Sequence, residues 1–156
     1  YRKSLLSNSN PYTPAVNLVF ALDEALKMMR DEGLDNIFLR HNKHKLAMSN
    51  AVKVLNLKLF ADEKHLSPSV TAIKTEGMDA EQFRKTIKNK FDILLAGGQD
   101  HLKGKIFRVG HLGYVNDRDI ITIISAISNT LLRLGKISAQ QAGEALVVVS
   151  KYLEET

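Results

Sequence analysis

The segment from Ile106 to Gly110 constrains the fold of this chain more than any other, because glycine-containing turns on both sides confine it to a short extended run. Its isoleucine, phenylalanine and valine are residue types that favour strands. Successive side chains of a strand point to opposite faces, so Phe107 and Val109 face one way and Arg108 faces the other. The sequence therefore predicts a strand with one core face and one open face that carries an arginine.

Arg108 has two interpretations at this stage. Gly110, two residues further along the same face, leaves space beside the guanidinium, and a planar guanidinium is suited to hold a carboxylate or a phosphate through two parallel hydrogen bonds. The alternative is a solvated arginine on the outer face of an antiparallel strand, and the spacing alone favours that alternative. His111 lies on the opposite face, where a core or turn-bonding role is favoured over contact with a substrate.

The Gly104-Lys105 pair before this strand does not make a nucleotide-binding loop. Such a loop requires a glycine, four intervening residues, Gly-Lys and then Ser or Thr. Gln99 stands where the first glycine is needed, and Ile106 stands where the hydroxyl residue is needed. The sequence therefore gives no support for a phosphate-binding loop here.

Composition excludes several other classes of protein. A chain of 156 residues with 44% hydrophobic residues can form one domain with a real core, and the absence of cysteine excludes a disulfide framework. The net charge of +5 is dispersed among acidic residues, and only 6% of residues are aromatic, so a nucleic-acid partner is disfavoured. No apolar run is long enough to span a bilayer, and we expect a soluble, cytoplasmic protein without a membrane partner.

Periodicity predicts helices on both sides of a strand-rich middle. The expected elements are a helix from 16 that ends at Gly33, a helix capped by Asp35 that extends to 55, strands over 57–60 and 69–75, a short helix capped by Asp79, strands over 91–95 and 106–110, a helix capped near Asn116 or Asp117 that ends at Gly135, and a final helix opened by Ser138 and Gln141. This order favours an α+β fold in which a small sheet packs its apolar face on helices.

Three segments together carry a resemblance to a known family. Residues 104–113 read Gly-Lys-Ile-Phe-Arg-Val-Gly-His-Leu-Gly, residues 10–26 contain a Thr-Pro motif followed by a helix, and residues 32–36 and 40–41 lie between them. In this order and spacing the chain resembles the class V pyridoxal-phosphate aminotransferases, in the alanine/serine–glyoxylate branch that includes bacterial soluble hydrogenase subunits. The resemblance implies the C-terminal domain of that family, an α+β unit with a mostly antiparallel sheet.

The resemblance also implies how the chain would divide and what it would lack. Residues 1–15 would be a linker from a missing large domain, and residues 16–156 would be the small domain. Pyridoxal phosphate needs a Schiff-base lysine, an acid partner for its ring nitrogen, a phosphate cradle and a carboxylate clamp. The family's lysine and aspartate lie upstream of the Thr-Pro motif, so this chain is expected to be inactive alone.

Site residues follow from the resemblance by position. Arg108 matches the arginine that grips the α-carboxylate of the substrate, with alanine or serine as amino donor and glyoxylate or pyruvate as acceptor. Thr13 matches a threonine that contacts the cofactor phosphate of the neighbouring subunit in a homodimer. Asn10 stands where some relatives have a tyrosine as a second phosphate contact, and Tyr12 lies beside Thr13 instead, which leaves that contact open.

Other functions were weighed against this one. A stand-alone module that binds a small carboxylate through Arg108, or a partner through its apolar helices, is the alternative. His41 and His44 lie one turn apart on a predicted helix, but no Asp or Cys at ligand spacing joins them, so the sequence does not predict a metal site. A nucleophile elbow, a catalytic triad and paired carboxylates have no recognisable pattern.

Overall fold

The structure is a computed structural model that describes residues 2–154. The chain divides into two compact units, Tyr1–Phe38 and Leu39–Thr156, which are described separately here. The expected division into a linker of residues 1–15 and a domain of residues 16–156 remains a prediction, and its residues 1, 155 and 156 lie outside the described part.

The first unit contains α1 (Arg2–Leu6), α2 (Val16–Glu32) and the start of α3 (Leu34–Val54). Gly33 ends α2 as predicted: its φ of 84° is in the left-handed region, and its N–H donates to the carbonyl of Met29. The predicted cap at Asp35 is wrong, because α3 begins directly after this glycine and places Asp35 in its first turn. None of the residues of α2 is buried.

The second unit is built around a four-stranded antiparallel sheet in the order β1-β2-β4-β3. Its strands are β1 (Lys58–Leu59), β2 (Val70–Lys74), β3 (Ala96–Gly97) and β4 (Ile106–Gly110). The strand that carries Arg108 is therefore central, with Ala72 of β2 and Ala96 of β3 directly opposite Arg108 on its two sides. The Arg108 strand is confirmed, and β1 and β2 lie within the predicted strand ranges 57–60 and 69–75.

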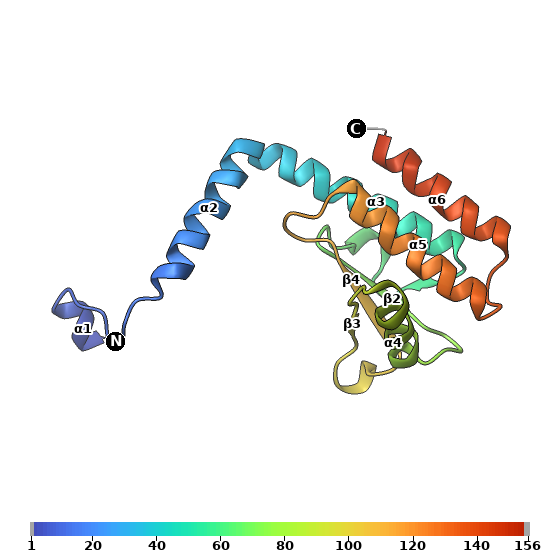
Figure 1. Ribbon diagram of the computed structural model, residues 1–156, viewed down its shortest axis with the longest axis horizontal. Coiled ribbons are helices and arrows are strands. Elements are labelled where there is room, and N and C mark those ends of the chain that lie inside the picture. Colours follow the sequence, from blue (N-terminus) through green and yellow to red (C-terminus); the bar gives the residue numbers. More distant parts are fainter. Residues whose placement is uncertain (1, 155–156) are drawn as a thin grey trace. The chain divides into compact units, whose positions relative to one another are not determined.

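Helices cover one face of this sheet. They are the continuation of α3, α4 (Ala80–Phe91), α5 (Asp117–Arg133) and α6 (Ala139–Glu154), with two short 3₁₀ turns, η1 (Glu63–His65) and η2 (Asp100–Leu102). Figure 1 shows α5 and α6 running side by side as an antiparallel pair, and the two helices are in contact. The predicted α+β class is confirmed.

Side-chain caps fix where three of these helices begin. Asn116 accepts from the backbone of Arg118 and Asp119, and the Asp119 carboxylate accepts from the N–H of Asn116, which completes a capping box for α5. The predicted box of Ser138 and Gln141 is also present at α6. At α4, Asp79 accepts from the N–H of Glu81. Each such cap typically stabilises its helix by about 1 kcal/mol.

The core lies between the inner sheet face and the helices. Phe107 and Val109 of β4 are fully buried, as the strand alternation predicts. The ring of Phe107 lies 5.1 Å from that of Phe83 on α4, measured between centroids. The largest buried contributions from α3 and α5 are Met48, Val52, Ile120, Ile124, Ile127 and Leu131. Burying each large apolar side chain contributes about 1.5–3 kcal/mol.

The predicted strand over 91–95 is wrong. Phe91 is the last residue of α4, and Asp92 ends that helix with a φ of 55° in the left-handed region. The strand begins only at Ala96 and is two residues long. The left-handed cap Asp92 lies inside the apolar run 91–95. The run is therefore split between the end of α4 and an irregular segment before β3.

Candidate functional site

Arg108 lies half-buried on the outer face of β4, opposite the core. Its Nε donates a hydrogen bond of 3.0 Å to the carbonyl of Gly97 on the neighbouring strand β3. Within residues 2–154, neither of its two terminal nitrogens has a hydrogen-bond or ion-pair partner. The side chain is thus held through Nε, while the two terminal nitrogens, which form the fork that binds carboxylates, remain available.

The sheet around Arg108 is built from small residues. Its direct neighbours across the two strand pairs are Ala72 and Ala96. A Cβ added at Gly110 would meet no atom within 4 Å, so the surface next to Arg108 is open, as predicted. Ile106 differs from the expectation of an open face: it shares that face but is only 4% exposed. Gly98 of the preceding turn lies close to the Ile106 side chain, since a Cβ added there would come within 3.0 Å of its Cγ1.

Two glycines let the turn before β4 fold this closely. A Cβ at Gly98 would overlap the carbonyl of Leu102, which is backbone and cannot move aside cheaply. A Cβ at Gly97 would lie 2.5 Å from Nη1 of Arg84. Gly98 therefore requires glycine, whereas a side chain at Gly97 would force the Arg84 and Glu81 side chains to shift. The carbonyl that holds Arg108 belongs to Gly97.

His111 anchors the loop that follows β4. It is fully buried, and its Nδ1 lies 3.1 Å from the carbonyl of Pro68 while its Nε2 lies 2.9 Å from Oγ1 of Thr71. A carbonyl only accepts, so Nδ1 carries the hydrogen and the Thr71 hydroxyl donates to Nε2. Burial lowers the pKa of His111 to about 4. The predicted core and turn-bonding role is confirmed.

Arg40 of α3 also holds this loop through hydrogen bonds to its backbone. Nη1 of Arg40 donates to the carbonyls of Gly113 and Val115, at 3.0 and 2.8 Å. Leu112 and Tyr114 of this loop remain exposed to solvent, at 69% and 80%. The backbone of the loop is therefore fixed while its apolar side chains project outward.

A partly buried polar cluster of Lys43, His44 and Asp117 joins α3 to the start of α5. Nε2 of His44 lies 2.9 Å from Oδ1 of Asp117, and Nζ of Lys43 lies 3.1 Å from Oδ2 of the same carboxylate. Lys43 also donates to the carbonyl of Leu153 on α6. Burial lowers the pKa of His44 despite the opposing effect of Asp117. Burial raises the pKa of Asp117, but hydrogen bonds from His44 and Lys43 outweigh it, and the net shift is downward.

Sequence analysis missed this group because its members are far apart in the chain. For His41 and His44 the sequence disfavoured a metal pair and favoured half-buried rings on the apolar face of the helix, and the structure pairs His44 with Asp117. Among residues 2–154 no cluster of three or more His, Asp or Glu side chains is placed to hold a metal ion. The sequence did carry one signal for this group: Arg40, Lys43 and His44 stand three and four positions apart, which places them on the same face of a helix.

Thr13 and Asn10 belong to the first compact unit, not to the unit that carries Arg108. Both residues are exposed, and both lie outside the helices of that unit. Their predicted contacts with a cofactor phosphate remain predictions.

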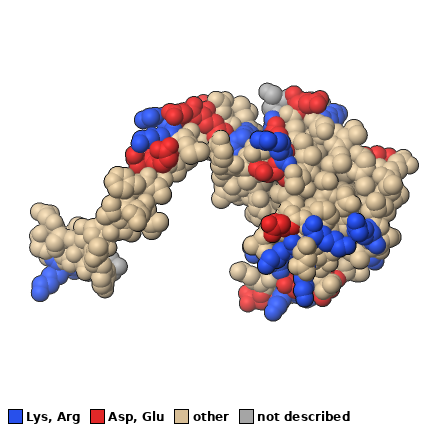
Figure 2. Space-filling model, viewed as in Figure 1, with Lys and Arg blue, Asp and Glu red and all other residues tan. Residues whose placement is uncertain are grey.

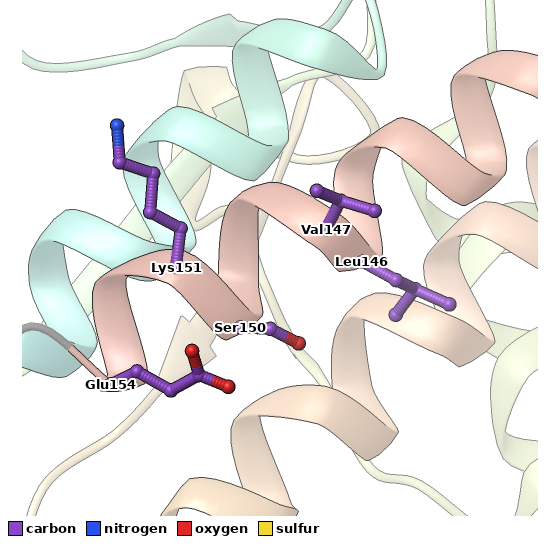
Figure 3. A pocket seen from close by; sticks show the side chains of 5 residues that line it. All are labelled: Leu146, Val147, Ser150, Lys151 and Glu154. Carbon is purple, nitrogen blue, oxygen red and sulfur yellow. The ribbon is translucent and has the colours of Figure 1, made fainter.

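Other surfaces of the described residues offer weaker sites. A hollow of about 500 Å³ is lined by Leu146, Val147, Ser150, Lys151 and Glu154. Figure 3 shows that all five side chains come from α6, so the hollow lacks groups that converge from several elements. Figure 2 shows basic side chains forming a band on the lower part of the larger unit with acidic side chains among them. In residues 2–154, no helix meets the length and hydrophobicity that crossing a membrane requires.

Comparison with known proteins gives the family. No protein-family model matches the chain. It is 53% identical over 135 residues to the soluble hydrogenase 42 kDa subunit of Anabaena cylindrica, covering 86% of this chain and 35% of that protein. It is 32% identical over 139 residues to (S)-ureidoglycine–glyoxylate transaminase of Bacillus subtilis, covering 88% of this chain and 33% of that protein.

A solved structure agrees with these sequences. The crystal structure of ureidoglycine–glyoxylate aminotransferase from Bacillus subtilis superposes with a TM-score of 0.82 and 31% identity, over 90% of this chain and 37% of that one. The chain is homologous to class V aminotransferases. The resemblance predicted from residues 10–26 and 104–113 is thereby confirmed. The chain spans about a third of the length of the class V aminotransferases that it matches, and it corresponds to their C-terminal third.

Proposed function

We propose that this chain is the small domain of a pyridoxal-phosphate-dependent aminotransferase, in which Arg108 binds the α-carboxylate of the amino-acid or keto-acid substrate. Alanine or serine would be the amino donor, and glyoxylate or pyruvate the acceptor. The relatives named as glyoxylate aminotransferases support this substrate class. The domain would be inactive alone, because the Schiff-base lysine is expected outside it.

One observation carries the proposal most of all: the terminal nitrogens of Arg108 have no partner within residues 2–154, although the side chain is half-buried and fixed through Nε. An arginine held in this way keeps a planar pair of donors free for a planar anion. The small residues Ala72, Ala96 and Gly110 around it leave space for such an anion. This arrangement binds and orients a carboxylate; it moves no proton by itself.

The residues of the chain fit a part of the cofactor site. Pyridoxal phosphate, when bound, withdraws electrons from the α-carbon of the substrate. The exposed hydroxyl of Thr13 and the exposed amide of Asn10 are donors of the kind that hold a phosphate. None of the described lysines is buried, which is what the domain would show if the cofactor lysine lay elsewhere. In this proposal Thr13 and Asn10 act on the cofactor of the second subunit of a cytoplasmic homodimer.

The test is to replace Arg108 in a full-length enzyme that contains this domain. Arg108→Ala should slow the half-reactions with alanine and with serine, because the carboxylate loses a charged partner worth on the order of 2–5 kcal/mol in transition-state binding. Arg108→Lys should restore only part of the rate, since one ammonium cannot reproduce the fork. Rapid-mixing kinetics give the rates, and the visible absorbance of the cofactor should remain nearly unchanged.

Thermal unfolding serves as the control, because an arginine on an open face contributes little packing and its loss should change stability little. The proposal fails if Arg108→Ala keeps its half-reaction rate. It also fails if the rate is lost only together with the fold, in which case Arg108 is a structural residue.

A further inference from the structure

The sheet does not use two backbone carbonyls at the short strand β3, that of Gly97 in the strand and that of Leu95 just before it. The N–H of Gly98 donates to the carbonyl of Ile106, so Gly98 directs its backbone groups toward β4. Backbone groups of a strand alternate in direction from one residue to the next, so the carbonyls of Gly97 and Leu95 point to the opposite, free edge. Free carbonyls at a sheet edge need partners from outside the ladder.

Two arginines supply these partners. Nε of Arg84 donates to the carbonyl of Leu95 at 2.7 Å, and Nε of Arg108 donates to the carbonyl of Gly97 at 3.0 Å. Arg84 comes from α4, whose Phe83 packs on the core face of the sheet, and Arg108 lies on the outer face. The strand is therefore held from both of its faces.

Arg84 is itself fixed. Its Nη1 donates to Oε2 of Glu81 at 2.8 Å, and its side chain is 22% exposed. The pair lies against Gly97, since a Cβ there would come within 2.5 Å of Nη1 of Arg84 and within 2.7 Å of Oε1 of Glu81. Because Gly97 has no side chain, the ion pair of Arg84 and Glu81 can lie directly against β3.

We propose that Arg84 is a positioning residue for Arg108: with Glu81 it fixes the edge strand β3, and the carbonyl of Gly97 on that strand sets the direction of the Arg108 guanidinium. The consequence for substrate binding rests on the proposed function of Arg108. Displacing β3 would leave Arg108 in place on β4 but would free its forked end to rotate, and a rotating fork binds a carboxylate with a larger loss of entropy.

Arginine Nε–H resonances of the isotopically labelled chain test this directly. The Arg108 signal is assigned by its disappearance in Arg108→Lys. In the unmodified chain its hydrogen exchange with water should be slow, because the proton is bonded to Gly97. In Arg84→Met, which keeps the apolar stem and removes the guanidinium, exchange at Arg108 should accelerate roughly two- to twelvefold, the range that one net hydrogen bond corresponds to.

Matched variants separate positioning from general loss of structure. Lys85→Met changes an exposed neighbour on the same helix and should leave the Arg108 signal unchanged. Arg84→Lys should be intermediate, because an ammonium can pair with Glu81 but lacks the fork. Gly97→Ala should accelerate exchange at Arg108 as Arg84→Met does. It should add little in an Arg84→Ala background, where the Glu81 side chain has lost its ion-pair partner and can move away from the new methyl group.

The proposal is overturned if exchange at Arg108 is the same in Arg84→Met as in the unmodified chain while circular dichroism shows an intact fold. If Arg84→Met does not fold, Arg84→Lys and Gly97→Ala decide, and an unchanged Arg108 signal in both rejects it. Titration with pyruvate is recorded separately. A positioned Arg108 that responds to pyruvate neither in this chain nor in a full-length enzyme that contains this domain would contradict the proposed function and leave the role of Arg84 standing.

Discussion

At the scale of single residues, this domain separates an arginine with free donors from a histidine whose two ring nitrogens are both used internally. Arg108 keeps its terminal nitrogens free on the outer face, whereas His111, on the core face three residues later, bonds Pro68 and Thr71 through both ring nitrogens. The alternation of one strand therefore places a candidate ligand group and a structural group on opposite sides of the sheet.

The stability of the domain should depend on the protonation of His111. The pKa of His111 is lowered to about 4 by burial, from an ordinary value of 6.5. Between these values the unfolded chain binds the proton more strongly, so the free energy of unfolding falls as pH decreases from 6.5 toward 4, by about 3 kcal/mol in total. Above pH 6.5 the contribution is fully present. Charge repulsion from the nearby His44 and His41 also disfavours protonation of His111.

Urea unfolding at a series of pH values measures this effect. His111→Gln, which cannot titrate, should unfold more easily at pH 7 and show a smaller slope between pH 6.5 and 5. His65→Gln is the matched control, because His65 is exposed and its replacement should leave the slope unchanged. An unfolding free energy that does not change with pH in this window would contradict the assignment, as would an equal slope in His111→Gln.

At the scale of elements, the segment between α4 and β4 is defined by close backbone approach rather than by hydrophobic burial. The strand β3 is only two residues long and lies at the sheet edge, and Gly98 packs directly against the carbonyl of Leu102. A segment held in this way tolerates an added methyl group only where space exists.

Two glycine replacements should therefore differ in effect. Gly98→Ala forces its Cβ against the Leu102 backbone and should destabilise the domain by about 1–3 kcal/mol, the usual cost of overpacking. Gly110→Ala meets no atom within 4 Å and should change stability by less than about 0.5 kcal/mol. Thermal and urea unfolding of both variants give the comparison. Equal stability of the two would mean that the turn before β4 is looser than the structure shows.

At the scale of the whole molecule, the two compact units differ in how much they bury. The unit from Leu39 onward has a continuous core, whereas α2 has no buried residue, and its N-terminal part from Val16 to Leu22 carries no charge. Figure 2 shows this part of the first unit without basic or acidic side chains. A helix that is apolar on several sides is normally covered by other protein, which agrees with a chain that spans a third of its relatives.

Backbone exchange should report this difference. We expect the amides of residues 7–14, which are all exposed and include Thr13, to exchange quickly in the isolated chain. Amides in the central strand β4 should exchange slowly by comparison. Hydrogen exchange read by mass spectrometry distinguishes the segments. Strong protection of residues 10–13 in a monomer would show that the segment packs within its own unit, and the proposed contact of Thr13 across a dimer would lose its support.

The isolated chain should also fail to bind pyridoxal phosphate covalently at one defined lysine. Its described lysines are exposed or half-buried, whereas a lysine that forms a Schiff base is activated in a desolvated pocket. After incubation with the cofactor and reduction with borohydride, intact-mass analysis should show no stoichiometric adduct. A single lysine labelled completely, together with turnover of alanine and glyoxylate, would overturn the proposal that this domain is inactive alone.

The sequence by itself determined the elements whose signals are local. Helical spacing and the capping residues Asn116 and Ser138 predicted α5 and α6, and strand alternation placed Arg108 opposite Phe107. These predictions held because each depends on residues within one or two turns, or on neighbours along one strand.

Only the tertiary structure decided which distant groups meet. Arg84 and Arg108 bond the carbonyls of Leu95 and Gly97 at the edge strand β3, and each pair is 11 positions apart along the chain. His44 bonds Asp117, which is 73 positions away. Neither periodicity nor composition encodes such pairs, because they depend on how helices and strands pack after they have formed. The free end of Arg108 follows from the same packing, since Nε bonds the carbonyl of Gly97 and no acceptor among residues 2–154 bonds the terminal nitrogens.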